Sequence, residues 1–429
     1  MTPQIRITYR PNSTPLSYTA SPFKLLCRDI CLALRYAWAL PFAFLPLRIG
    51  RTDHLDELYP SVRTGVSAGF QVLLAVYQVL FLLSIPVAII FMVPGVWIFL
   101  YILATVTLNH VFCMVVLNGS QRLIVSRVPV PEQPSHSDER WFFINGIAGS
   151  HSWVQQNVDQ LSYTFGRKIT GIHNRTYGQV ATQSITIVLA NSIFRSGFVF
   201  DLIECLIQRC FSYATGDIRS AYPLVKNALL DPTCQKVVFI LHSQGGIEGG
   251  LVIDWLLDAL PHDLLQHLEV YTFANAANHF NNPTRKWFPK SNGSHSSTLL
   301  EQDRSVGFIE HYANTVDIVA WIGVFHFINI PNRYMGRLFV HPGSGHLLNQ
   351  HYLDPMFTLG PDHKVLENNP FMDMEVETNS EKMPEEDCEQ TLLPTSDSQG
   401  SPDKIDSQVL RVKDFSRLWK YRNGGSPTD

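Results

Sequence analysis

Charged residues are scarce in this chain and are missing altogether from one long stretch. Asp, Glu, Lys and Arg make up 16% of its 429 residues, whereas soluble domains usually contain about 25%. The net charge is −4, so a broadly basic surface for nucleic acid is not expected. Residues 64–121 contain none of the four charged types. A soluble domain of ordinary composition has no such stretch.

The charge-free stretch is long enough for two membrane helices. One crossing of a bilayer takes about 20 apolar residues, and a proline and a Pro-Gly pair break the run near its middle. We therefore expect helices at residues 66–92 and 96–117, joined by a very short loop. Together they predict a membrane hairpin at residues 64–121.

Positive residues on both outer flanks set the orientation of this hairpin. Arg48, Arg51 and Arg63 precede it, and Arg122 and Arg127 follow it. By the positive-inside rule both ends face the cytosol, so the chain after the hairpin is expected to be cytosolic. An integral membrane protein of the endoplasmic reticulum or of lipid droplets would fit this geometry.

The cysteines form no recognisable framework. There are seven, and the spacings of Cys27 with Cys31 and of Cys205 with Cys210 match no common zinc or redox signature. Scattered thiols are typical of a reducing, cytosolic environment. A cleavable signal peptide is not expected either, because charges recur inside the apolar stretch at residues 23–49. Within the N-terminal segment, 1–63, this stretch is expected to lie among lipid headgroups.

Composition divides the rest of the chain into three parts. Residues 122–139 are rich in proline and polar residues and are expected to be a linker. Residues 140–361 alternate apolar runs with helical patterns, which predicts an α/β domain with a doubly wound, mostly parallel sheet. Residues 362–429 are acidic and rich in Ser and Pro, which is typical of a disordered tail. Within the tail, residues 409–422 have the pattern of a basic amphipathic helix, or of a solvated end with accidental periodicity.

The most informative stretch is at residues 236–259. Five apolar residues, 237–241, fit a buried parallel strand, and apolar residues recur at helical spacing from Ile247 onward. His-Ser-Gln-Gly-Gly stands between them. A serine at such a sharp turn takes a strained backbone conformation, and the helix N-terminus offers N–H groups to a developing oxyanion. Ser243 is therefore the candidate nucleophile, with a buried serine that caps the helix as the alternative.

A serine nucleophile needs a base, and the base needs a third group to orient it. Asp317 follows the penultimate expected strand, and His346 follows the last one. His341 and His351 compete for the role of base, but we expect His341 to remain in the strand and His351 to lie on the next helix. The alternative role for Asp317 is a helix cap.

The turn at 242–246, followed by an acid and a histidine in this order, resembles the α/β-hydrolase fold of serine esterases and lipases. The resemblance covers about residues 140–359 and omits the hairpin and the tail. It implies an α/β-hydrolase sheet and a triad of Ser243, His346 and Asp317. One position departs from the family's Gly-x-Ser-x-Gly pattern: Leu241 stands at its first glycine, which implies wider packing around the turn.

The same resemblance implies an oxyanion hole made of two backbone N–H groups. One belongs to Gln244, the residue after the nucleophile. The other comes from the Asn-Gly-Ile sequence that follows an expected strand, with Ile147 as the first choice and Gly146 as its alternative. The alternative role for Asn145 is to cap a turn.

These features predict a membrane-anchored serine hydrolase that cleaves a carboxylic ester of a lipid or another apolar acyl group through an acyl-enzyme. Thioester or amide cleavage and acyl transfer are related chemistries. The alternative is a catalytically silent α/β-hydrolase-like scaffold at the membrane, which Leu241 favours. No cofactor is expected, and the spacing of His346 and His351 does not match a His-Glu-x-x-His metal site. The expected partners are the bilayer and the lipid or acyl-ester substrate, without nucleic acid.

Overall fold

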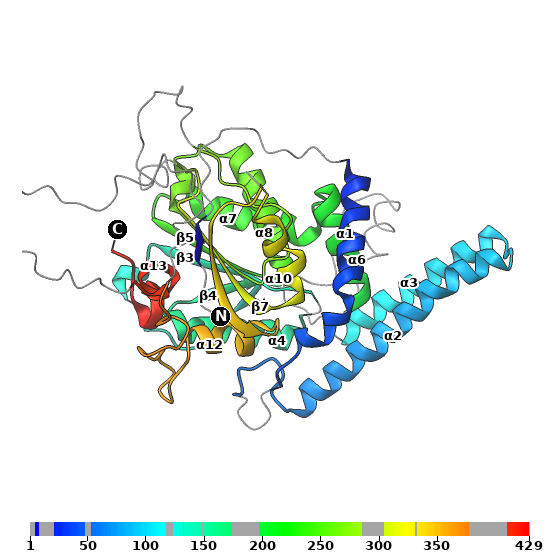
Figure 1. Cartoon of the computed structure of the whole chain (residues 1–429), viewed down its shortest axis with the longest axis horizontal. Coiled ribbons are helices and arrows are strands. Elements are labelled where there is room, and N and C mark those ends of the chain that lie inside the picture. The colour runs from blue at the N-terminus through cyan, green and yellow to red at the C-terminus, as the bar shows by residue number, and fades with distance from the viewer. Residues whose placement is uncertain are drawn as a thin grey trace, which may run out of the picture.

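A mostly parallel sheet forms the centre of the molecule (Figure 1). The computed structural model describes residues 5–7, 21–47, 53–116, 123–131, 133–147, 149–173, 197–284, 304–330, 333–376 and 410–428. Its eight strands lie in the order β1-β8-β7-β6-β5-β3-β4-β2. The two edge strands are antiparallel to their neighbours, and the strands between them are parallel. The mixed α/β class and the mostly parallel sheet are therefore confirmed.

The strands are β1 Ile5–Ile7, β2 Leu123–Val125, β3 Glu139–Ile144, β4 Ile169–Ile172, β5 Lys236–His242, β6 Leu268–Phe273, β7 Phe308–Val316 and β8 Arg337–Ser344. The longer helices are α1 Pro22–Tyr36, α2 Val62–Ile90, α3 Gly95–Val116, α4 His151–Phe165, α6 Phe198–Phe211, α7 Gly216–Leu230 and α8 Gln244–Ala259. The short ones used below are η1 Ala37–Ala43, α10 Ile318–Ile322, η4 Leu348–Leu353, α13 Val412–Phe415 and η6 Leu418–Gly424.

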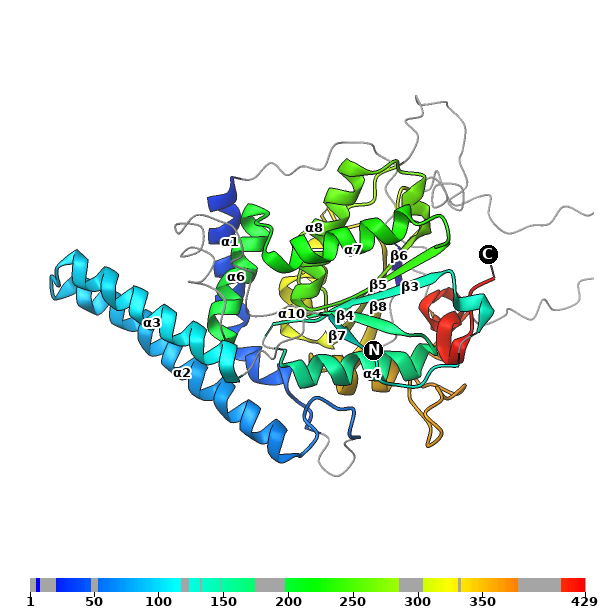
Figure 2. The same ribbon diagram turned by 180° about the vertical axis from the view of Figure 1, so that it is seen from behind.

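Helices cover both faces of the sheet, which explains why its central strands are apolar without alternation. In β5, Phe239 and Leu241 pack in the cluster that contains α7 and α8. The residues between them, Val238 and Ile240, pack in the cluster that contains α4. Figure 2 shows α7 and α4 on opposite sides of the strands. The parallel strands all end on the same side of the sheet, called the carboxyl-end edge below. The turn after β5 lies there.

The α2–α3 hairpin projects from the domain (Figures 1 and 2). Segments Thr64–Ile90 and Gly95–Cys113 are long and apolar enough to cross a membrane, close to the expected bounds. Ser61 caps α2 by accepting a hydrogen bond from the Thr64 N–H at 3.1 Å. Within the hairpin, the Gln78 amide donates to Asn109 Oδ1 at 3.1 Å. This hydrogen bond pairs two polar side chains in an apolar setting, and Gln78 Oε1 also accepts from the Val199 N–H at 3.1 Å.

The C-terminal part of the chain corrects the expected disordered tail. Residues 362–376 and 410–428 belong to the fold, and the acidic centre of the tail lies outside the described residues. Leu418, Trp419 and Tyr421 are buried against the α4 face of the sheet. The Arg417 guanidinium pairs with Glu269 at 2.9 Å. Burial of these apolar side chains stabilises the fold, so the apolar residues that suggested a lipid-facing helix instead face the core from two short helices, α13 and η6.

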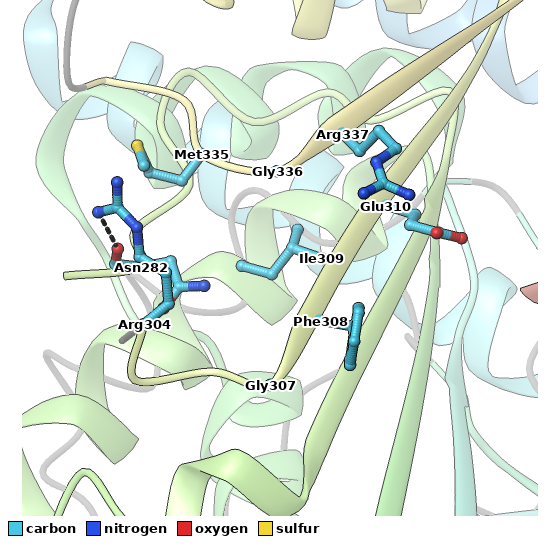
Figure 3. Close-up of a pocket in the computed structure, with 9 residues that line it drawn as sticks. All are labelled: Asn282, Arg304, Gly307, Phe308, Ile309, Glu310, Met335, Gly336 and Arg337. Atoms are coloured by element: carbon cyan, nitrogen blue, oxygen red, sulfur yellow. Dashed lines mark hydrogen bonds between the residues drawn. The ribbon is translucent and has the colours of Figure 1, made fainter. Parts of the chain in front are cut away.

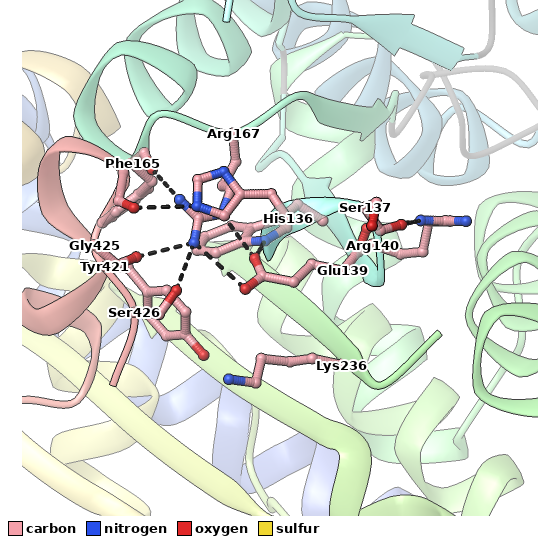
Figure 4. Close-up of polar contacts among 12 residues, drawn as sticks. His136, Ser137, Glu139, Arg140, Phe165, Arg167, Lys236, Tyr421, Gly425 and Ser426 are labelled. Atoms are coloured by element: carbon pink, nitrogen blue, oxygen red, sulfur yellow. Dashed lines mark hydrogen bonds and ion pairs between the residues drawn. The ribbon is translucent and has the colours of Figure 1, made fainter. Parts of the chain in front are cut away.

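The expected linker also belongs to the fold. Strand β2 pairs with β4, and His136 contacts the Gly424 carbonyl at 3.2 Å. Arg167 connects this region to the C-terminal segment (Figure 4): its guanidinium donates to Glu139 at 2.7 Å and to the Gly425 carbonyl at 2.9 Å. Buried hydrogen bonds to a charged partner hold both segments against the amino-end edge of the sheet.

Candidate active site

Ser243 occupies a sharp turn between β5 and α8. Its φ of 59° and ψ of −120° lie in a region that residues other than glycine rarely adopt. Backbone hydrogen bonds hold this strained conformation on both sides. The Ser243 N–H donates to the Phe273 carbonyl at 3.0 Å, and the Ser243 carbonyl accepts from Gly246 at 3.0 Å and Ala276 at 3.2 Å. The turn therefore presents the Ser243 side chain at the carboxyl-end edge of the sheet.

The three residues that the sequence singled out converge at this edge. His346 Nε2 lies 2.9 Å from Ser243 Oγ. On the other side of the ring, Nδ1 lies 2.9 Å from Asp317 Oδ2 and 3.2 Å from Oδ1. With the Nδ1–H donated to the carboxylate, Nε2 is free to accept the serine proton. This hydrogen-bonded order is what an activated serine requires.

Asp317 both caps a helix and orients the histidine, so the two roles that the sequence suggested for it are compatible. It precedes α10, and its Oδ1 accepts from the Val319 N–H at 2.8 Å. Its Oδ2 also accepts from the Tyr352 hydroxyl at 2.7 Å. Burial raises the pKa of Asp317, but His346 and the hydrogen bonds lower it by more, so the pKa lies below its usual value. The buried carboxyl group is therefore ionised beside His346.

His242 and Tyr352 support the site and were missed by sequence reasoning. The His242 Nε2–H donates to the carbonyl of His346 at 2.8 Å. Burial, and then the proximity of His346, lower the pKa of His242 to about 3. A neutral His242 thus keeps donating to the base loop across the physiological range. Its position next to the nucleophile was the available signal, whereas nothing in the local pattern marks Tyr352.

The competing histidines have other partners. His341 lies in β8, and its Nδ1 is 2.8 Å from Asn314 Oδ1. His351 lies in η4, where its Nδ1 accepts from the Leu347 N–H at 3.1 Å and its Nε2 contacts the Pro46 carbonyl at 3.2 Å. Of the three, the structure brings His346 to Ser243.

The residues expected for the oxyanion hole lie on the loop after β3 and at the start of α8. A Cβ on Gly146 would lie 2.6 Å from Ser243 Cβ and 3.0 Å from its Oγ, so only glycine fits there. Gln244 is the first residue of α8, and Ile147 packs against the core that contains this helix. The Asn145 side-chain amide donates to the Gly146 carbonyl at 2.7 Å. The loop and the helix N-terminus thus both border Ser243.

Two cavities lie at the amino-end edge of the sheet, on the opposite side from Ser243. One of about 30 Å³ is formed where β7 and β8 begin (Figure 3). A larger one, about 840 Å³, lies between residues 126–141 and the start of β4. Neither includes Ser243, which is only 3% exposed. Among the described residues, no group of three His, Cys, Asp or Glu side chains could hold a metal ion.

Comparison of the chain with models of known protein families, with curated proteins and with solved structures finds no match. The chemistry of the site therefore has to be argued from its geometry. A strained serine, a histidine within hydrogen-bond reach and a buried carboxylate are the groups that nucleophilic acyl transfer uses: the serine oxygen attacks the carbonyl while the histidine takes its proton.

Proposed function

We propose that this protein is a membrane-anchored serine hydrolase that cleaves a carboxylic ester of a lipid or another apolar acyl group. The observation that carries the proposal is the continuous hydrogen-bonded line from Ser243 through His346 to Asp317, with 2.9 Å at each step. The three residues are far apart in the chain, and each follows a different strand. Such a convergence is the geometry by which a triad is recognised.

The α/β-hydrolase fold is part of the proposal. The nucleophile follows β5, which has parallel neighbours on both sides, and the acid and the histidine follow β7 and β8. Serine, acid and histidine in this chain order, each at the carboxyl end of a strand, are typical of α/β-hydrolases. The strained turn at Ser243 provides further support.

The proposed reaction proceeds in two stages. His346 Nε2 takes the hydroxyl proton as Ser243 Oγ attacks the acyl carbonyl. The backbone N–H groups of Gln244 and of Ile147, or alternatively Gly146, stabilise the oxyanion. His346 then gives the proton to the leaving alcohol, which leaves an acyl-enzyme. In the second stage His346 activates water, the acid is released, and the proton returns to Ser243.

The hairpin supports an apolar substrate and a membrane location. Two helices long enough to cross a bilayer precede the catalytic domain. With both ends of the hairpin on the cytosolic side, the catalytic domain is cytosolic, as on endoplasmic reticulum or lipid droplets. Protease added to sealed microsomes should then digest the domain, while alkaline carbonate should leave the protein in the membrane. Protection of the domain would reverse this orientation.

Labelling with a fluorophosphonate tests the proposed activity. The purified full chain should react, and Ser243→Ala should abolish the reaction while the far-UV circular dichroism is unchanged. Ser220→Ala is a matched control, since Ser220 lies in α7 and donates to the Gly216 carbonyl. Persistent labelling of Ser243→Ala would overturn the assignment of the nucleophile.

The alternative is a catalytically silent scaffold at the membrane. The near-complete burial of Ser243 favours it. It predicts that the full chain in detergent and in lipid vesicles neither reacts with the fluorophosphonate nor hydrolyses any ester.

A further inference from the structure

The segment before the hairpin contacts two loops of the candidate active site. The His346 N–H donates to the carbonyl of Ala43 at 2.9 Å, so η1 is joined to the loop of the proposed base. Ala39 and Ala43 also pack against Ile318, the residue after Asp317. The segment therefore contacts the loops of both the histidine and the acid.

The outer face of this segment is apolar. From residue 37 to residue 47, every residue except Ala39 and Ala43 is exposed. The large side chains among them are Trp38, Leu40, Phe42, Phe44, Leu45 and Leu47. Trp38 is 64% exposed. A contiguous apolar face of this kind normally contacts a partner or a membrane.

Helix α1 continues this face and adds positive charge. Phe23 and Leu34 are exposed on it, together with Lys24, Arg28 and Arg35. Asp29, the one acidic residue from 21 to 47, is buried and pairs with Arg209 at 3.2 Å. The exposed charge of α1 is thus positive, which complements anionic lipid headgroups.

The hairpin extends well beyond the level of this face. Helix α6 packs on the hairpin where Phe200 meets Phe81 and Val106. From Phe81 to the end of α2 at Ile90 the helix advances about 14 Å, about half of a hydrocarbon core. Helix α1 lies beside α6 at the base of this projecting part (Figures 1 and 2).

We propose that α1 and η1 form a bilayer-binding face that roofs the active site, and that the ester substrate enters from the adjoining leaflet. The second part rests on the proposed hydrolase function. Contact of the outer face with lipid replaces water around its apolar side chains, whereas its inner face contacts the base and acid loops. Displacement of η1 toward the leaflet would open Ser243 to an acyl chain already in the bilayer.

Fluorescence quenching tests the bilayer contact without any activity. The full chain is reconstituted in vesicles of phosphatidylcholine and phosphatidylserine, with and without bromine on the acyl chains near the headgroup. The emission that Trp38 contributes is measured as the difference between wild type and Trp38→Phe. This contribution should be largely quenched by the brominated lipid. Trp255→Phe is the control, because Trp255 packs on Tyr222 in the domain and its emission should not be quenched. Equal quenching of the two contributions would overturn the bilayer face.

Kinetics test the route of the substrate. Hydrolysis of a long-chain ester within vesicles is compared with that of a short, soluble ester. Phe42→Ser should lower the ratio of the two rates about tenfold, since a large apolar contact with lipid is lost. Leu230→Ser is the matched control, because Leu230 is 49% exposed at the end of α7, near the opposite edge of the sheet. An unchanged ratio in Phe42→Ser would overturn entry from the leaflet.

The two readouts separate this inference from the proposed function. Absence of any Ser243-dependent hydrolysis of either the long-chain or the soluble ester would refute the hydrolase and, with it, substrate entry. The quenching of Trp38 would then still decide whether α1 and η1 bind the bilayer.

Discussion

The side chain of Leu241 occupies the space beside Gly249 in which any other residue would place its Cβ. Leu241 precedes His242 at the end of β5, and Gly249 lies on the face of α8 that packs against the sheet. The strand thus has a leucine where a glycine is expected, and Gly249 on the facing helix leaves the space for its side chain. The departure from Gly-x-Ser-x-Gly is accommodated by packing, and it leaves the Ser243 turn intact.

This relationship predicts that Gly249→Ala is destabilising. The added methyl group would overlap Leu241, and overpacking of this kind costs about 1–3 kcal/mol. Gly250→Ala is the control, because its Cβ would meet only ordinary contacts at 3.6 Å, so it should stabilise α8 by about 0.5–1 kcal/mol. Denaturant unfolding of the detergent-solubilised chain measures both. The packing account predicts that adding Leu241→Ala to Gly249→Ala costs less than the two single changes summed; additive effects would contradict it.

The sequence allowed the site to be predicted because its chemistry follows strand ends. The apolar runs at β5, β7 and β8 placed Ser243, Asp317 and His346 at one edge, so their meeting follows from parallel topology. The supporting contact from Tyr352 could not be predicted, since it depends on how η4 folds back.

The C-terminal segment could not be predicted for a different reason. An amphipathic period is the same whether its apolar face meets lipid or a protein core. The deciding information lies in distant carboxylates: Glu269 accepts from Tyr421 at 2.8 Å, and Glu310 accepts from the Arg417 N–H at 2.8 Å. Only the assembled sheet shows that these buried acids need partners.

Tyr352 should act as a positioning residue for Asp317. Its hydroxyl donates to the carboxylate and accepts from the Asn314 N–H at 3.0 Å. Tyr352→Phe should lower kcat/KM about tenfold. It should also move the acid limb of the pH profile to higher pH, because a carboxylate with one donor fewer stabilises protonated His346 more strongly.

Tyr312→Phe is the matched control for this effect. Tyr312 is also buried and donates to a carboxylate, Glu310, at 2.8 Å, and its hydroxyl bonds Ser416 rather than Ser243, His346 or Asp317. Its removal should reduce stability and leave the pH profile in place. A Tyr352→Phe variant with the wild-type profile would refute the positioning role.

His311 should make the fold less stable in mild acid. Its Nε2–H donates to the Met335 carbonyl at 2.9 Å, its Nδ1 accepts from Thr272, and burial lowers its pKa to about 4. Between pH 6.5 and 4 the unfolded chain binds a proton that the folded state does not. The free energy of unfolding should therefore fall by up to about 1.4 kcal/mol per pH unit as the pH falls through this window. Unfolding of His311→Gln should show a correspondingly shallower dependence on pH; an equal slope would exclude His311 as its source.

The three histidines near the carboxyl-end edge should differ sharply in their effect on turnover. His346→Ala removes the one that lies 2.9 Å from Ser243 Oγ, so ester hydrolysis should fall by several orders of magnitude. His341→Ala and His351→Ala remove contacts to Asn314 and Leu347 and should lower the unfolding temperature more than the rate. Asp317→Asn should also reduce kcat strongly, because it removes the charge that orients and stabilises protonated His346. Near-normal turnover in His346→Ala, with loss in His351→Ala, would show that the base is misassigned.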